Sequence, residues 1–91
     1  MANVIAGFTK KVSEQLVTIR EALARGDAET VRREAHSIKG GAAGLTADDL
    51  AKVAFELEIK GQSKNLTGAD QIVDALETKF EALRRYVEEK F

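Results

Sequence analysis

The sequence contains no cysteine and no proline, and four phenylalanines and one tyrosine are its only aromatic residues. The absence of cysteine excludes a disulfide framework and any metal site built on thiolates. The absence of proline and the small number of aromatic residues favour helix throughout the chain. No apolar run approaches the roughly 18 residues that a membrane-spanning helix requires. We therefore expect no membrane-spanning segment.

The charge of the chain is nearly balanced, although 32% of its residues are charged and the formal net charge is −1. A general nucleic-acid-binding protein needs a basic surface to displace counterions, so this class is not expected. The hydrophobic stretch before Lys10 is too short for a signal peptide, and we expect a cytoplasmic protein. A chain of 91 residues has the length of one domain, which we expect to span residues 1–91.

Hydrophobic periodicity predicts four amphipathic helices. The first runs from about residue 4 to residue 24, and the second follows Asp27 and reaches Leu45. The third runs from Thr46 to about Ile59, and the fourth begins near Thr67. The residues expected on the buried faces are Ile5, Phe8, Val12, Leu16, Ile19, Leu23, Val31, Ala35, Ile38, Ala42, Leu45, Leu50, Val53, Ala54, Leu57, Ile72, Val73, Leu76, Phe80, Leu83, Val87 and Phe91.

The expected helix ends carry recognisable stop and start signals. Gly26 ends the first helix and Asp27 caps the second. Thr46 with Asp49, and Thr67 with Asp70, resemble capping boxes that use the shorter acid. The segment 61–66 is polar and turn-like. Because all the connections are short, neighbouring helices run antiparallel, and we predict an all-α, antiparallel up-down four-helix bundle.

His36 is the only histidine of the chain. With about 100° of rotation per residue, it lies about 140° from the centre of the second helix's apolar stripe. A buried structural histidine is therefore not expected there. An ordinary solvated histidine and a functional one both remain open from geometry alone.

Three glycines follow His36 closely, namely Gly40, Gly41 and Gly44. Inside a helix each destabilises the protein by about 0.8–1 kcal/mol relative to alanine. Gly40 lies one turn beyond His36 on the same face, where a missing side chain leaves the imidazole accessible to another protein. The alternative is that the helix ends near Gly40 and that the glycines form a C-cap and loop.

The stretch AHSIKGGAAGLTADDLAKVAFELE, residues 35–58, resembles the signature of histidine phosphotransfer domains. That signature has a histidine, a lysine three residues later, a glycine four residues later, small residues on the next turn, and a Leu-Glu or Leu-Gln pair downstream. The segment HSIKGGA also resembles the phosphorylated N-terminal domain of chemotaxis-type histidine kinases. Thr46 stands where the family often has glycine, and Gly44 where it often has asparagine.

The resemblance implies that His36 accepts a phosphoryl group and exchanges it with aspartates of receiver domains. It also implies that Lys39 offsets the charge of the phosphoryl group, and that Glu58 accepts a hydrogen bond from the imidazole nitrogen that does not react. Glu58 lies about 80° from its helix's apolar stripe, at the boundary of the core. Solvated surface positions remain the alternative for both Lys39 and Glu58.

Several residues are candidates for a partner-binding surface. Phe55 and Ile59 lie about 140° and 180° from the core stripe of their helix. This exposed apolar pair either binds a partner or contacts the segment after Gly61, and the pattern supports both equally. The remaining candidates share the outward face of His36: Arg32, Gly40 and Ala43.

The chain lacks the glycine-rich G-x-x-x-x-G-K-[ST] loop of P-loop nucleotide-binding proteins, so we expect no autokinase activity from ATP and no enzyme activity of its own. It also lacks a carboxylate cluster with the spacing of metal ligands, and no cofactor is expected. Mg²⁺ is expected from the partner receiver. The expected partners are response-regulator receiver domains and a histidine kinase catalytic domain, and the chain is expected to be a monomer.

Other interpretations of the chain remain open. One is a degenerate helical bundle that binds partners without carrying phosphate, and another is a phosphoacceptor fragment of a larger histidine kinase. The dimeric phosphoacceptor hairpin of a sensor kinase fits less well, since it uses two long helices per chain. A hydrolase is poorly supported, because Ser37 points about 100° away from His36 on the helix and no triad is evident.

Overall fold

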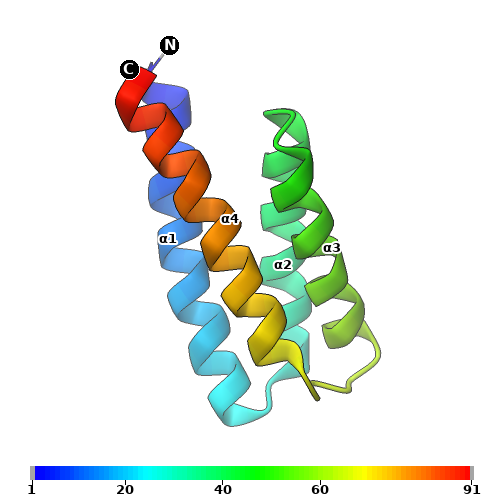
Figure 1. Ribbon diagram of the computed structural model, residues 1–91. Coiled ribbons are helices and arrows are strands. Elements are labelled where there is room, and N and C mark those ends of the chain that lie inside the picture. Colours follow the sequence, from blue (N-terminus) through cyan, green and yellow to red (C-terminus); the bar gives the residue numbers. More distant parts are fainter. Residues whose placement is uncertain (1, 91) are drawn as a thin grey trace.

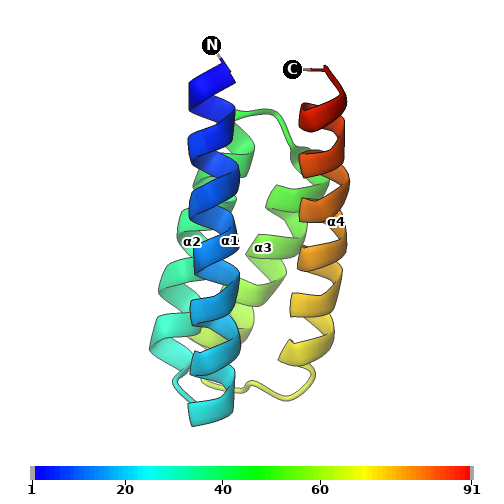
Figure 2. The ribbon, with the colours of Figure 1, turned by 90° about the vertical axis from the view of Figure 1, so that its left-hand side faces the viewer.

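The computed structural model describes the backbone of residues 2–90 and the side chains of residues 6–89. Its helices are α1 (Ala2–Arg25), α2 (Ala28–Gly44), α3 (Asp48–Gln62) and α4 (Ala69–Lys90), and residues 2–90 contain no strand. The helices alternate in direction along the bundle (Figures 1 and 2). The predicted all-α, antiparallel up-down four-helix bundle is confirmed. Within the described part of the chain, no helix combines the length and the apolar character needed to cross a bilayer.

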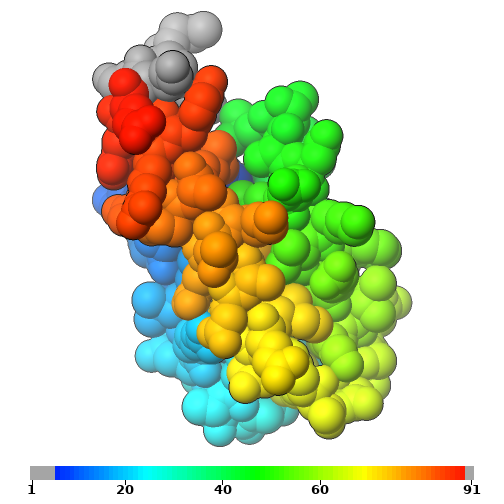
Figure 3. All heavy atoms as spheres, in the orientation of Figure 1, coloured from blue at the N-terminus to red at the C-terminus, as the bar shows by residue number. Residues whose placement is uncertain are grey.

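The four helices form a ring in which each helix packs against the next one along the chain, and α4 closes the ring against α1. The contact between α2 and α3 is the most extensive. In the space-filling view α4 lies across the front, between α1 and α3 (Figure 3). The groove between α2 and α3 therefore lies on the opposite side of the ring from the groove between α1 and α4.

The core contains the apolar stripes that periodicity predicts. Phe8, Leu23, Val53, Ile72 and Leu83 pack against this core while partly exposed. Leu45 and Val87 are half-buried, whereas the Ile5 side chain and Phe91 lie outside the described residues. The buried members of the core are Val12, Leu16, Ile19, Ala22, Val31, Ala35, Ile38, Ala42, Leu50, Ala54, Leu57, Ala69, Val73, Leu76 and Phe80.

The start of α2 agrees with the expectation from the sequence. Asp27 is its N-cap, and the Asp27 carboxylate accepts hydrogen bonds from the Thr30 backbone N–H at 3.1 Å and from the Thr30 hydroxyl at 2.6 Å. The preceding helix ends at Arg25, and Gly26 follows it with a φ of 70°, the left-handed conformation that glycine adopts without strain. These contacts fix the direction of the helix that carries His36.

The two predicted capping boxes are wrong. The helix α3 starts at Asp48 after Ala47, which caps it without a side-chain hydrogen bond, and α4 starts at Ala69 rather than near Thr67. Thr46 instead ends α2 in a Schellman motif: its own N–H bonds to the Ala43 carbonyl, and the Ala47 N–H bonds to the Ala42 carbonyl.

Thr46 adopts a φ of 57° in this motif. This left-handed conformation suits glycine far better than a β-branched residue. The geometry therefore gives a physical reason for the glycine that the related signature often has at this position.

The third helix extends beyond Ile59, so the assignment of Gly61 to a turn is wrong. Gly61 is buried inside α3 and lies directly against the backbone of α2. A Cβ atom built on Gly61 would lie 2.7 Å from the backbone nitrogen of Arg32 and 2.8 Å from the carbonyl oxygen of Ala28. The missing side chain thus allows α2 and α3 to approach closely, one turn away from His36.

We predict that Gly61→Ala destabilises the protein by about 1–3 kcal/mol, because the added methyl group meets backbone that can yield only if α2 and α3 separate. Chemical denaturation followed by circular dichroism measures the change. Gly40→Ala is the matched control, since a Cβ atom at Gly40 meets nothing within 4 Å and alanine has the higher helix propensity. Equal stability of the two variants would show that the close approach at Gly61 contributes nothing.

Candidate functional site

His36 lies in the middle of α2 with 62% of its side chain exposed. The helix continues through Gly40 and Gly41 to Gly44, so the alternative in which Gly40 forms a C-cap is wrong. Gly40 has no left-handed φ, and a Cβ atom there would stand in open space. The surface one turn beyond the imidazole is therefore open because Gly40 has no side chain.

Glu58 reaches from α3 to the imidazole, across the groove between α2 and α3. Its Oε2 atom lies 2.8 Å from Nδ1 of His36, while its Oε1 atom lies 2.7 Å from Nζ of Lys39. Only 13% of the Glu58 side chain is exposed. Glu58 precedes Gly61 by three residues and shares its helix face, so the close approach at Gly61 also brings Glu58 within reach of His36.

The pKa of Glu58 is held below its ordinary value, chiefly by the Lys39 ammonium group and further by the bond to His36, while burial opposes this shift. The carboxylate is therefore ionised at neutral pH. An ionised carboxylate can only accept hydrogen bonds, so the 2.8 Å contact requires a proton on Nδ1. In the neutral imidazole that proton leaves the lone pair of Nε2 free.

The other residues predicted for the outward face of α2 are Arg32, Gly40 and Ala43. Arg32 pairs with Glu29 on its own helix, with Nε 3.1 Å from Oε2 and Nη2 2.5 Å from Oε1. Gly40 and Ala43 are exposed and extend the face of His36 toward the end of α2. Both residues are small, so neither covers the imidazole of His36.

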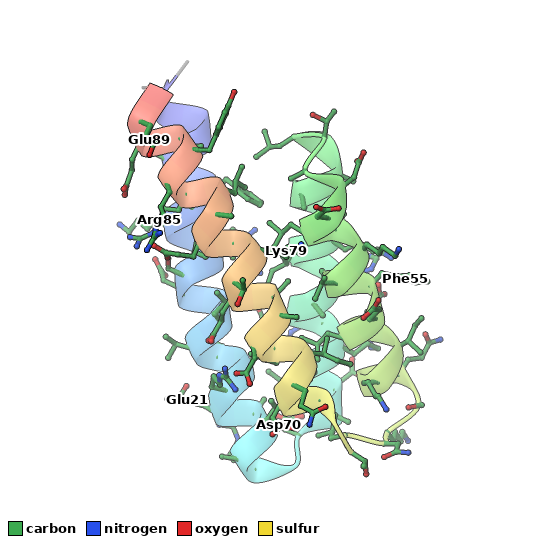
Figure 4. The ribbon with its side chains drawn as sticks, viewed as in Figure 1. Glu21, Phe55, Asp70, Lys79, Arg85 and Glu89 are labelled. Atoms are coloured by element: carbon green, nitrogen blue, oxygen red, sulfur yellow. The ribbon has the colours of Figure 1, made fainter. Side chains whose placement is uncertain are left out.

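Phe55 is 48% exposed to solvent and Ile59 is 46% exposed, so the segment after Gly61 does not bury them. Phe55 projects from α3 on the side away from α4 (Figure 4). The Lys39 ammonium group lies 4.8 Å from the centre of its ring, within the range of a cation–π interaction. Helical periodicity in the sequence gives no sign of this contact, because it joins residues on two different helices.

An open surface hollow of about 670 Å³ lies beside the site, between α2 and α3, and its lining includes Arg32, Glu58 and Gly61. Another surface hollow, of about 1110 Å³, lies between α1 and α4, away from His36, and is lined by residues such as Leu16, Arg20 and Phe80. Among the described residues, no group of three or more histidine, cysteine or acidic side chains is placed to bind a metal. What the arrangement offers is an exposed, oriented nucleophile that another protein can reach.

Comparisons with known proteins identify the family. The model of the Hpt domain family matches residues 3–86. The crystal structure of histidine-containing phosphotransfer protein B (HptB) from Pseudomonas aeruginosa PAO1 is similar, with a TM-score of 0.94 and 29% sequence identity. The alignment covers 98% of this chain and 77% of that chain. No curated protein sequence matches the chain. The chain belongs to the Hpt domain family and functions in histidine phosphotransfer within phosphorelay signalling.

Proposed function

We propose that His36 is the phosphoacceptor, and that its Nε2 atom exchanges a phosphoryl group with the aspartate of a receiver domain. The observation that carries the proposal is the contact of 2.8 Å between Nδ1 of His36 and the ionised Glu58 carboxylate. This contact supports the tautomer in which Nε2, the nitrogen without the proton, is the nucleophile.

In the forward step the Nε2 lone pair attacks the phosphorus atom of the receiver's aspartyl phosphate. The N–P bond forms as the P–O bond to the aspartate breaks, and the aspartate leaves as a carboxylate. The ring keeps its Nδ1 proton and gains positive charge, which the Glu58 carboxylate stabilises. The reverse step returns the phosphoryl group to a receiver by the same bond changes.

Lys39 is proposed to offset the charge of the phosphoryl group. It lies three residues after His36, so the two side chains are neighbours on the surface of the same helix. The proposed partner surface is the docking face, which we define as Arg32, Gly40, Ala43, Phe55 and Ile59. The Mg²⁺ ion and its acidic pocket are proposed to belong to the receiver. The chain itself contributes the position of the nucleophile on a rigid helix.

Hpt proteins interact with receiver domains and with kinases in phosphorelays. For this chain we propose response-regulator receivers as the direct partners and a histidine kinase catalytic domain as a further phosphoryl source. We also propose that residues 1–91 act as one monomeric domain in the cytoplasm. A mass in light scattering equal to that of one 91-residue chain, and unchanged with concentration, would distinguish it from a dimeric phosphoacceptor hairpin.

The test of the proposed function is transfer from a panel of receivers that have been labelled with radioactive acetyl phosphate or by their kinases. We expect the label to move to this chain from at least one receiver, in an acid-labile and alkali-stable form. A degenerate bundle would bind a receiver without taking the label. Binding without transfer across the panel would therefore contradict the proposal.

We predict that Glu58→Ala slows phosphoryl transfer by about 10- to 150-fold without abolishing it, because a hydrogen bond to a charged group contributes about 1.5–3 kcal/mol. The nucleophile remains, but its tautomer and ring orientation are no longer held. Transfer rates at a saturating concentration of one receiver measure the effect. Glu56→Ala, which removes an exposed carboxylate from the same helix, is the control. Equal rates for the two variants would remove Glu58 from the mechanism.

A further inference from the structure

The ammonium group of Lys39 is held from two sides in the groove between α2 and α3. Nζ lies 2.7 Å from Oε1 of Glu58 and 4.8 Å from the centre of the Phe55 ring. The Lys39 side chain is 30% exposed. An ion pair that is partly open to water holds a flexible lysine only weakly, because ordering the side chain opposes it. The second contact, with the ring, is what favours one position of the ammonium group.

The Oε1 atom of Glu58 depends on this lysine. It is shielded from solvent and makes no hydrogen bond of good geometry within the described residues. The ammonium group at 2.7 Å is therefore its electrostatic compensation. A shielded carboxylate oxygen without such compensation turns toward water. The two oxygens of a carboxylate move together, so this rotation would take Oε2 away from Nδ1 of His36.

We propose that Phe55 is a positioning residue: its ring holds Lys39 on Glu58, and Glu58 in turn holds the imidazole of His36. The proposal rests on the proposed function of His36 and adds a role to Phe55 besides docking. Contacts run continuously from the ring to the lysine, the carboxylate and the imidazole. Phe55 itself does not contact the reacting atoms, so it acts on His36 only through Lys39 and Glu58.

A docking role and a positioning role affect different kinetic quantities. Removing a docking contact raises the receiver concentration needed for half-maximal transfer, whereas removing a positioning contact lowers the rate at saturation. We expect Phe55→Leu, which keeps apolar bulk but loses the ring, to lower the saturated rate by about two- to five-fold, the factor that corresponds to one exposed cation–π contact. Phe55→Trp, which keeps an aromatic face, should restore that rate.

Ile59→Ala is the matched control within the docking face, since Ile59 is as exposed as Phe55 and takes no part in the cation–π contact. It should change the half-saturating receiver concentration and leave the saturated rate unaltered. Thermal melts of all three variants verify that each is folded. A saturated rate that Phe55→Leu leaves unchanged, or that Phe55→Trp fails to restore, would overturn the positioning role.

The second measurement does not depend on phosphoryl transfer. Carbon-detected NMR of the Glu58 carboxyl group follows its titration directly, and Lys39 is the main cause of its lowered pKa. Phe55→Leu should raise the Glu58 pKa toward its ordinary value, part of the way to the value in Lys39→Met, while Phe55→Trp and Ile59→Ala should not. A Glu58 titration identical in Phe55→Leu and the parent would overturn the inference. This result would stand even if the receiver panel showed no transfer, so the two proposals can fail separately.

Discussion

The variant His36→Gln is expected to lose phosphoryl uptake completely while the bundle stays folded. His36 is the only histidine of the chain and is mostly exposed, so its replacement leaves no cavity in the core. Glutamine can also donate a hydrogen bond from its amide to Glu58. It has no nitrogen lone pair able to attack phosphorus, and transfer therefore stops at the first step.

Two measurements make this expectation decisive. Label transfer from the best receiver of the panel should fall to background, and the thermal melt should stay within a few degrees of the parent. Ser37→Ala, the neighbouring change on the same helix, should transfer at a normal rate. An acid-labile label retained by His36→Gln would place the phosphoryl group on another residue and would reject the assignment.

The second large effect concerns Gly40, where stability and function are expected to change in opposite directions. Gly40→Leu should unfold no more easily than the parent and should gain up to about 1 kcal/mol, since leucine is a far better helix former than glycine. A side chain on a helix leans toward the N-terminus, and that of residue 40 would cover the turn that carries His36. Transfer should therefore fall by at least about ten-fold, the effect of roughly 1.4 kcal/mol on the barrier.

Gly40→Ala separates the two contributions, because it improves the helix while adding only a methyl group. We expect this variant to be stabilised and to transfer faster than Gly40→Leu. Melting curves and transfer rates should be measured on the same preparations. A leucine variant that transfers as fast as the parent would show that receivers do not approach His36 over Gly40.

The positions of the helices and the faces they bury could be derived from the sequence, because both depend on short-range periodicity. An apolar residue every three or four positions identifies the inner face of a helix, and this placed Ile38 in the core and His36 outside it. The glycines near His36 allowed two interpretations, since a glycine in a helix and a glycine that ends one look alike in the sequence. The structure shows that Gly40 lies within the helix α2 and does not end it.

The helix ends were less predictable because several local signals compete for them. Thr46 and Thr67 each precede an acidic residue by three positions, as in a capping box, yet neither caps a helix. Thr46 takes the left-handed conformation that ends α2, and its hydroxyl donates to the Leu45 carbonyl at 2.6 Å. Thr46 therefore satisfies carbonyl groups at the end of α2 instead of capping the start of α3, as the sequence had predicted.

By itself the sequence determined four amphipathic helices, their buried faces, and an exposed His36 with a lysine and a small residue beside it. Only the tertiary structure decided which residues meet across α2 and α3. Gly61 lies in α3 directly against the α2 backbone. The short distance between the two helices lets Glu58 reach both His36 and Lys39. Periodicity describes the direction of a side chain around its own helix axis. The distance and rotation between two helices depend on how their surfaces fit together, which no single helical pattern contains.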